Sequence, residues 1–481
     1  AWTSLMTGRA PGRHGIFDFF RKDTATAPHI RFLTARDVGC TTLWEQVTAH
    51  GLKATVLNFP LTFPAPPING HVVPGGWMPW RQLPLACRPA TLYARLAELP
   101  GFNPRELAMD MAHEEKAIEG CRRDEYEEWI ALHVRREQQW FSVLRYLMQE
   151  EPSELVAVLF DGVDKLQHLC WRFLDPATAA ALASPWERQV RERCLEYFRT
   201  LDGLIEEIVA LAGSKATVVV ASDHGFGPQV RTFSVNTWLQ RQGHLAWQDG
   251  SAPRATESET LGMGQLARHV YSLDWTRTRA FAPMPSGNGI HIVQADWNPA
   301  GVPPSEYEAF RDRLIHDLLQ VRDPITGTPV VSRVWKREEI FDGPFLTLAP
   351  DVTLELEDGG LVSILAADEV VAPRPEPTGS HRPDGVFIAA GPLLRADAAV
   401  PSLSILDVAP LLLNVLELPV PEELEGRLPA ELFEGAVQQH AAPNGAPVHA
   451  DAAAVPAAEQ LLDQEAEAEI LKRLQALGYV E

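Results

Sequence analysis

The sequence predicts a three-layer α/β/α sandwich around a mostly parallel sheet. Short, near-continuous aliphatic runs recur along the chain and alternate with stretches of helical periodicity. Aliphatic runs without polar alternation are typical of strands that are covered on both faces, as in a central sheet. The expected strands are residues 55–57, 155–160, 216–221 and 386–390.

Polar residues gather next to three of these runs. Asp161 follows the run 155–160, Ser222-Asp223-His224-Gly225 follows the run 216–221, and His381 lies in a turn-rich segment just before the run 386–390. Ligands bind at the carboxyl ends of the strands in such sheets. We therefore expect the functional site at this edge of the sheet.

The expected domain organisation is one catalytic domain with additions. The domain covers residues 1–434, and two insertions, at about 100–150 and 228–375, are expected to cap the sheet. Residues 435–456 are rich in Ala and Pro without periodicity, which predicts a flexible linker. Leucines at helical spacing predict a last helix over 457–481.

Composition excludes several classes of protein. The 481 residues are 46% hydrophobic and 22% charged, as in an ordinary globular protein. A net charge of -22 argues against a nucleic-acid duplex or an anionic membrane as partner. The five cysteines show no CxxC spacing, which argues against a thiolate zinc site or a disulfide framework. No apolar run is long enough for a membrane span. We expect a cytoplasmic location, with a signal peptide upstream of Ala1 as the open alternative.

Three short motifs carry metal-ligand chemistry. Asp164 and His168 are one helical turn apart, so both side chains can face one ion. Asp223 and His224 lie at a sharp strand exit, and His381 lies in a turn of small residues. Carboxylates and imidazoles are the usual ligands of zinc, manganese and iron. Each motif alone is more often structural, but three of them in this order beside strand ends predict a metal site.

These motifs, with the amino-terminal segment, resemble the alkaline-phosphatase superfamily, and within it the type I phosphodiesterase/nucleotide pyrophosphatase branch. Segment 382–385 and the closing segment 477–479 resemble proteins described as predicted phosphohydrolases or phosphomutases. The likeness covers nearly the whole chain and predicts an alkaline-phosphatase-like fold. The matching segments are Trp2-Thr3-Ser4-Leu5-Met6-Thr7-Gly8-Arg9-x-Pro11-Gly12-x-His14-Gly15-Ile16, Asp164-x-x-x-His168, Ser222-Asp223-His224-Gly225 and Gly379-x-His381.

The resemblance implies two divalent metal ions, most commonly zinc, with manganese or iron as alternatives. Asp164, His168 and His381 resemble the ligands of one ion. Asp223 and His224 resemble two ligands of the other. The implied reaction passes through a covalent phospho-Thr or phospho-Ser intermediate, which water then hydrolyses.

The resemblance also implies a nucleophile that this sequence does not contain. In this branch a Thr or Ser precedes the Thr7-Gly8 pair by more residues than stand before it here. We expect the nucleophile, and a first strand with a further metal-binding Asp, upstream of Ala1. Thr3, Ser4 and Thr7 are expected to cap or pack the first helix, whose amino-terminal amides would point at the phosphate.

Sulfatases share the metal scaffold, but this sequence departs from their pattern. The Arg of their Cys-x-Pro-x-Arg motif would fall at Trp2. Cys87-Arg88-Pro89 resembles that motif only superficially, because it lacks the Arg and lies far from the expected position.

The sequence indicates the substrate-binding residues less clearly than the metal ligands. Asn58, Thr62 and Asn288 lie in loops, where they could bind substrate or stabilise turns. The expected partner is a small phosphorylated molecule, and a nucleotide, a lipid headgroup and a sugar phosphate all remain open, as does the oligomeric state.

The sequence therefore predicts a metal-dependent phosphoric ester hydrolase. One alternative is a phosphomutase of the same superfamily, which would return the phosphoryl group to bound substrate. The other is a catalytically inert binding protein on this fold, against which the five retained ligand-type residues argue.

Overall fold

A computed structural model describes most of the chain. The described residues are 1–21, 31–75, 80–107, 116, 121–248, 272–284, 286–396 and 402–434. They belong to one compact unit, Ala1–Gln438. The expected linker 435–456 and the expected helix 457–481 lie outside the described residues.

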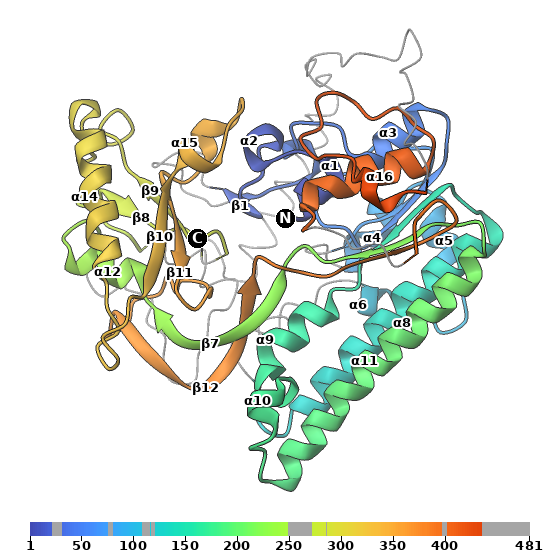
Figure 1. The fold of residues 1–481 in the computed structure, drawn as a ribbon, viewed down its shortest axis with the longest axis horizontal. Coiled ribbons are helices and arrows are strands. Elements are labelled where there is room, and N and C mark those ends of the chain that lie inside the picture. Colours follow the sequence, from blue (N-terminus) through green and yellow to red (C-terminus); the bar gives the residue numbers. More distant parts are fainter. Residues whose placement is uncertain are drawn as a thin grey trace. The chain divides into compact units, whose positions relative to one another are not determined.

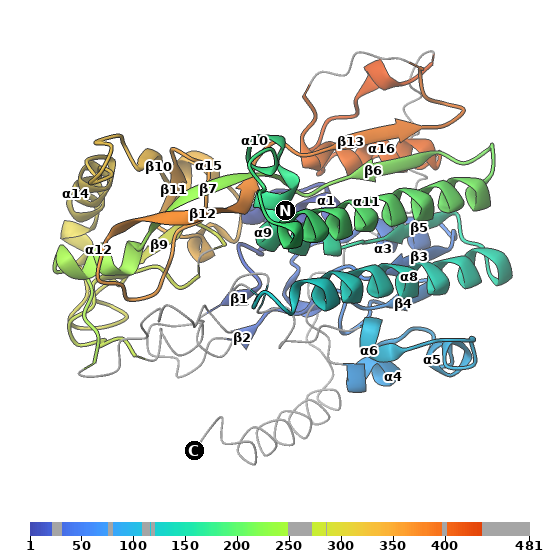
Figure 2. The same cartoon turned by 90° about the horizontal axis from the view of Figure 1, so that it is seen from below.

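Figure 1 shows the fold of the described residues, and Figure 2 labels the three parallel strands that form one part of the expected central sheet. β3 (Ala54–Leu57) lies between β4 (Gly70–Val73) and β5 (Leu155–Val158). Val56 is opposite Val72 on one side and Ala157 on the other. The apolar runs at 55–57 and 155–160 therefore form strands, as predicted.

Helices cover both faces of this sheet, as the layered fold requires. Leu57 and Val73 pack with Trp140 and Leu144 on one face, and Val56 packs on the other. This alternation follows from the two-residue period of a strand. On the first face lie α8 (Tyr126–Glu150) and α11 (Pro185–Ala212), and on the second α1 (Trp2–Thr7), α3 (Leu43–Ala49) and α16 (Val408–Val415).

The predicted α/β class and its helical layers are confirmed. Region 100–150, expected as a cap, contributes α8 to the helical layer beside α11 (Figure 2).

The other two expected strands form a separate pair. β6 (Val218–Ala221) and β13 (Phe387–Ala390) are antiparallel, with Val220 opposite Ile388. They make a two-stranded sheet that is distinct from the β4-β3-β5 sheet, and Figure 2 shows the two groups of strands apart. The central sheet therefore comes in two pieces rather than one.

Much of region 228–375 forms a lobe with its own hydrophobic core, which we call the insertion lobe. Its sheet has the order β10-β11-β9-β8. Phe281, Ile290, Leu314 and Val352 are among its buried residues. Its elements are α12 (Val235–Arg241), β8 (Ala280–Phe281), β9 (Gly289–Ile292), α14 (Tyr307–Leu319), β10 (Val331–Lys336), α15 (Arg337–Ile340) and β11 (Val352–Leu356).

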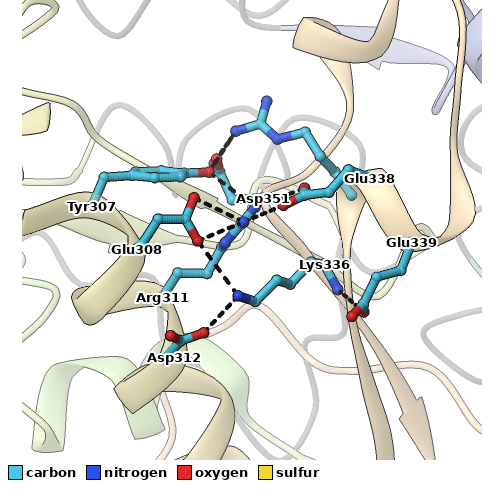
Figure 3. Close-up of polar contacts among 9 residues, drawn as sticks. Tyr307, Glu308, Arg311, Asp312, Lys336, Glu338, Glu339 and Asp351 are labelled. Atoms are coloured by element: carbon cyan, nitrogen blue, oxygen red, sulfur yellow. Dashed lines mark hydrogen bonds and ion pairs between the residues drawn. The ribbon is translucent and has the colours of Figure 1, made fainter.

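A charged network joins α14, β10 and α15 in this lobe (Figure 3). The Arg311 guanidinium is only 2% exposed and donates to carboxylate oxygens of Glu308, at 2.9 Å, and Glu338, at 2.8 Å. Lys336 pairs with Asp312 at 2.6 Å. The buried Arg311 side chain thus links α14 to α15, and Lys336 links α14 to β10.

A long antiparallel ribbon connects the insertion lobe to the rest of the unit. It consists of β7 (Gly225–Phe233) and β12 (Val371–Arg382), which Figure 1 shows side by side. The register shifts between Pro373 and Thr378. His381, expected in a turn, instead lies near the end of β12 opposite Phe226. The turn was expected from the small residues and the proline of segment 378–385, but β12 continues through this segment as far as Arg382.

The remaining elements are short or flank the core. None of the described helices is long and apolar enough to cross a bilayer. The elements are α2 (Pro11–His14), β1 (Phe20–Arg21), β2 (Arg31–Phe32), α4 (Leu83–Ala86), α5 (Leu92–Leu96), α6 (Pro104–Leu107), α9 (Gly162–Leu174) and α10 (Pro176–Ala179).

Candidate metal centre

The first two predicted ligands lie on α9, directly after β5. β5 ends at Val158 and α9 begins at Gly162, so Asp164 lies in the first turn of the helix. His168 follows one turn later on the same side, and its Nε2 lies 3.5 Å from Asp164 Oδ1. The predicted one-turn spacing is therefore realised on a helix.

A buried carboxyl fixes the beginning of α9. Glu137 Oε1, on α8, accepts the Gly162 N–H and the Tyr197 hydroxyl, each at 2.8 Å. Burial, with the nearby charge of Asp161, raises the pKa of Glu137 to about 8. Glu137 thus holds the helix end that carries Asp164.

Asp223 and His224 lie in the short connection between β6 and β7. β6 ends at Ala221 and β7 begins at Gly225. Ser222 Oγ accepts the Val386 N–H at 2.7 Å, which ties this connection to the neighbouring segment. A Cβ at Gly225 would lie 1.9 Å from the Asp384 carbonyl oxygen, so a glycine is required here.

His381 reaches the cluster because β12 packs closely on α9. A Cβ at Gly379 would lie only 2.0 Å from the Gln167 carbonyl oxygen. The missing side chain at Gly379 therefore allows the approach that brings His381 next to Asp164 and His168.

Asp164 Oδ1 is the centre of the cluster. It lies 3.3 Å from His381 Nε2 and 3.7 Å from His224 Nε2. The Nε2 atoms of His168 and His381 are 3.0 Å apart, and the rings of His224 and His381 stack with centroids 3.7 Å apart. Three imidazoles thus direct Nε2 toward one carboxylate oxygen.

Backbone carbonyls orient two of the imidazoles. Nδ1 of His168 lies 3.1 Å from the Gly379 carbonyl oxygen, and Nδ1 of His224 lies 3.1 Å from that of Gly225. A carbonyl only accepts, so each Nδ1 carries the proton and donates it. In the neutral rings the Nε2 lone pairs then face Asp164, which is how proteins orient metal-binding histidines.

The residues of the cluster fit a divalent cation. Asp164 Oδ1 is buried and has no hydrogen-bond partner. Ligand atoms of Asp164, His224 and His381 lie within 4.8 Å of one another. One carboxylate with imidazole nitrogens suits zinc, manganese or iron. A cation would satisfy the otherwise unpaired buried oxygen.

The five predicted ligands lie close together, and His224 adjoins both of the expected groups. His224, expected with Asp223 at a second ion, lies with Asp164 and His381. Asp223 Oδ1 is 3.5 Å from His224 Nε2. Asp164, Asp223, His224 and His381 line a cavity of about 1460 Å³.

The charges of the cluster perturb its carboxylates in opposite directions. Burial disfavours ionisation of Asp164, but its electrostatic interactions with His168 and Lys165 outweigh burial and hold its pKa well below the usual range. Burial and the Asp164 charge raise the pKa of Asp223, against the opposing charge of His224. Burial also lowers the pKa of His224. Asp164 is therefore the stable anion of the site.

The hydroxyls of the first helix have structural partners. Thr7 Oγ1 donates to the Thr3 carbonyl at 2.7 Å, and Ser4 Oγ bonds to His14 Nε2 at 3.0 Å. His14 Nδ1 accepts the Ile16 N–H at 3.1 Å, and burial lowers the pKa of His14 to about 3. The hydroxyls of Ser4 and Thr7 are thus engaged within the first two helices, which fits the packing role expected for them.

The three substrate candidates also make backbone contacts. Asn58 Nδ2 donates to the Leu159 carbonyl at 2.8 Å, and Thr62 Oγ1 to that of Phe59 at 2.7 Å. Asn288 Oδ1 accepts the Val362 N–H at 2.9 Å. Asn58 lines the cavity, whereas Thr62 and Asn288 do not. These contacts fit the turn interpretation.

Sequence reasoning missed three residues of the site. Lys165 Nζ lies 3.3 Å from Asp164 Oδ2, and the Phe226 ring contacts the His168 and His381 rings. Asp18 accepts the Ser286 hydroxyl at 2.6 Å and lines the same cavity. Lys165 adjoins a predicted ligand, which was an available signal. Asp18 follows no predicted strand, and Phe226 depends on the β7–β12 pairing.

Most of the sequence matches a known protein family. The profile of the family "Type I phosphodiesterase / nucleotide pyrophosphatase" matches residues 1–384. The chain belongs to this family. Type I phosphodiesterases and nucleotide pyrophosphatases are phosphoryl hydrolases of the alkaline phosphatase superfamily, whose members use divalent metals. Among proteins with curated descriptions, none matches this member of the family.

Solved structures similar to this type I phosphodiesterase family member are distant. Phosphonoacetate hydrolase from Sinorhizobium meliloti 1021, in complex with phosphonoformate, has 16% identity and a TM-score of 0.42, over 86% of this chain and 83% of that chain. Its complex with phosphonoacetate has a TM-score of 0.43 at the same identity and coverage. A mutant of alkaline phosphatase PafA has 12% identity and a TM-score of 0.47, over 90% and 89%.

Proposed function

We propose that this protein is a metal-dependent phosphoric ester hydrolase, acting on phosphodiesters or phosphomonoesters with two divalent ions, most commonly zinc. The observation that carries the proposal is the buried, unpaired Asp164 Oδ1, toward which Nε2 atoms of His168, His224 and His381 converge. Family membership supports the reaction class.

The five residues divide between the two ions in this proposal. Asp164, His168 and His381 would hold one ion, and Asp223 with His224 would contribute to the other. His224 lies close to both groups. When bound, the ions supply Lewis-acid charge that stabilises the attacking and leaving oxygens of an in-line displacement.

The chain's own residues prepare the site for an anionic substrate. Asp164 stays ionised and holds the imidazoles in place. The Lys165 ammonium, beside Asp164 Oδ2, places positive charge at the cavity wall, where it attracts a phosphate group. Phe226 packs against the imidazole rings and restricts their rotation. The expected substrate is a small phosphorylated molecule.

The proposal includes a covalent intermediate on a Thr or Ser hydroxyl. Ser4 and Thr7 are not assigned this role, because their hydroxyls are engaged within the first two helices. Mass spectrometry of acid-quenched reactions would locate a phosphorylated Thr or Ser. A phosphate on Ser4 or Thr7 would contradict this assignment.

The proposal is tested by hydrolysis of bis(p-nitrophenyl) phosphate and p-nitrophenyl phosphate. Metal-stripped protein should be inactive, and zinc, manganese or iron should restore turnover. His381→Ala and Asp223→Ala should abolish turnover and lower the bound metal. The exposed residues His316 and Asp202 provide the controls His316→Ala and Asp202→Ala, which should match the unmodified protein. Full turnover in stripped protein, or in both site variants, would refute the proposal.

A further inference from the structure

The cavity that contains the metal cluster also reaches Asp18, which has no part in the proposed reaction. Asp18 lines this cavity together with Asp164, Asp223 and His381. It lies between α2 and β1, outside any helix or strand. An acidic side chain on the wall of such a cavity is placed to contact a part of the substrate that the metal ions do not hold.

The chain on either side of Asp18 is fixed by its neighbours. The Phe17 ring lies edge-on to the Phe341 ring, with the centroids 5.0 Å apart. The Phe19 carbonyl oxygen accepts the Leu33 N–H at 2.9 Å. Because both adjacent residues are held, the Asp18 carboxylate has a defined position on the cavity wall, as a recognition group requires.

The described residues offer only neutral donors to the Asp18 carboxylate. Its Oδ1 accepts the Phe19 N–H and its Oδ2 accepts the Ser286 hydroxyl, both at 2.6 Å. Ser286 belongs to the insertion lobe, in the turn before β9. No lysine, arginine or histidine side chain in the described part of the chain forms an ion pair with Asp18, and burial raises its pKa. The carboxylate charge is therefore left without a side-chain counter-ion.

Asp18 differs in this respect from the other acidic residues that line the cavity outside the cluster, within the described ranges. Glu154, Asp384 and Glu417 are exposed, so water compensates their charges. Asp161 Oδ2 lies 3.8 Å from the guanidinium of an arginine on α8. Asp18 is half-buried and has neither form of compensation.

The missing compensation indicates what Asp18 would bind. A half-buried carboxylate without a counter-ion is unfavourable, and an ammonium group that donates to it compensates its charge. A phosphate group is repelled by Asp18 and attracted by the Lys165 ammonium, which lines the same cavity beside Asp164. The two charges therefore favour a ligand that has its phosphate at the cluster and a cationic group at Asp18.

We propose that Asp18 is a specificity-determining residue that binds an ammonium group on the alcohol portion of the substrate. The substrates are then phosphate esters of amino alcohols, a narrower class than the small phosphorylated molecules of the proposed function. The inference rests on that function for the position of the phosphate. The site for the ammonium group depends on Asp18 and its neighbours alone.

Pairs of aminoalkyl and alkyl phosphates test this proposal. In each pair an ammonium group replaces a terminal methyl group of similar size, as in O-phosphoethanolamine and propyl phosphate. Pairs with aminoalkyl chains of two to six carbons cover a range of separations between phosphate and ammonium. The ratio of kcat/KM within each pair is measured in the unmodified protein, in Asp18→Asn and in Asp202→Asn, a control at an exposed position. The ratio does not depend on the fraction of folded or metal-loaded protein.

The unmodified protein should prefer the aminoalkyl phosphate of at least one pair by about 10-fold or more in kcat/KM, as expected for a charge-assisted hydrogen bond. Asp18→Asn keeps the shape and one acceptor but removes the charge, and it should lower this ratio by about 10-fold. Asp202→Asn should keep the ratio. Ser286→Ala removes a neutral donor and leaves the Asp18 charge, so it should keep the preference as well.

The same ratio in the unmodified protein and in Asp18→Asn at every chain length would overturn the proposal. That result would leave the hydrolase function intact, because both members of a pair are still hydrolysed. If no pair is hydrolysed, the hydrolase function fails and calorimetric binding of the same pairs decides the inference. The aminoalkyl phosphate should then bind more tightly than its alkyl partner to the unmodified protein but not to Asp18→Asn, and equal affinities would overturn the proposal.

Discussion

The Nε2 atoms of His168 and His381 lie 3.0 Å apart, although the two residues come from different elements and are separated by much of the chain. The His168 ring donates its Nδ1 proton to Gly379. Its Nε2 therefore has a lone pair directed at another imidazole and at Asp164. A cation held by all three groups makes this arrangement favourable.

His168→Ala should reduce the metal bound per chain. The substitution removes one of the three imidazoles whose Nε2 atoms face Asp164 Oδ1. Metal content after dialysis, measured by elemental mass spectrometry, checks this. His316→Ala removes an exposed imidazole and should leave the content unchanged. Equal metal in the His168 variant and the unmodified protein would exclude His168 from the centre.

Gly379→Ala should weaken metal binding in a folded protein. The added Cβ would lie 2.0 Å from the Gln167 carbonyl oxygen, so β12 must move away from α9. That shift disturbs both the His168 hydrogen bond and the position of His381. A loss of about 10- to 100-fold in metal affinity is expected, as for other residues that orient ligands.

Gly203→Ala is the matched control for Gly379→Ala, because a Cβ at Gly203 meets no neighbouring atom. It should leave affinity unchanged and stabilise α11 by about 1 kcal/mol. Calorimetric titration with zinc measures both variants. Unchanged zinc affinity in Gly379→Ala would show that the close approach is unimportant.

Glu137→Gln should change how stability depends on pH. The folded protein keeps Glu137 protonated up to about pH 8, whereas its ordinary pKa is 4.5. Between these values the unfolded chain releases the proton and the folded protein does not, so the free energy of unfolding falls as pH rises. Glutamine removes this contribution, which is on the order of a few kcal/mol.

Urea unfolding of Glu137→Gln at pH 5, 7 and 8.5 tests this expectation. The variant should gain stability over the unmodified protein as pH rises. Glu98→Gln, at an exposed position, should show no such trend. A stability difference that is the same at all three pH values would contradict the raised pKa.

Arg311→Leu should destabilise the insertion lobe without removing metal. It leaves Glu308 and Glu338 without their shared cation (Figure 3). Because both carboxylates are partly exposed, the expected cost is roughly 1–3 kcal/mol rather than the larger penalty of a fully buried pair. Thermal unfolding and metal content measure the two effects. Loss of metal with unchanged Tm would contradict a purely structural role.

The proximity of the candidate ligands was predictable where these residues adjoin regular elements. Asp164 and His168 share one helix, and Asp223 and His224 follow a strand of four aliphatic residues. The spacing along the sequence was sufficient to predict that the two residues of each pair lie together. The close contact between His224 and His381 could not be predicted, because it depends on how β12 pairs with β7.

The α/β class of the fold was predictable from the sequence, but the separation of the central sheet into two pieces was not. Periodicity indicated β3, β5, β6 and β13, since aliphatic runs mark buried strands. It could not indicate that β5 pairs with β3 and β6 with β13 in two separate sheets, because an aliphatic run does not specify the strand with which it pairs. β12 was missed because the prolines at 373, 375 and 377 are unusual in strands.

The β7–β12 ribbon connects the hydrophobic core of the insertion lobe with the candidate metal cluster. Phe233 and Val371, at one end, are buried in the insertion lobe, and His381, at the other, is part of the metal cluster. The position of His381 therefore depends in part on how the far end of the ribbon packs in the insertion lobe, among residues that do not contact the cluster. Since a misplacement of about 1 Å can cost on the order of 100-fold in rate, substitutions deep in the lobe can alter catalysis while leaving every ligand intact.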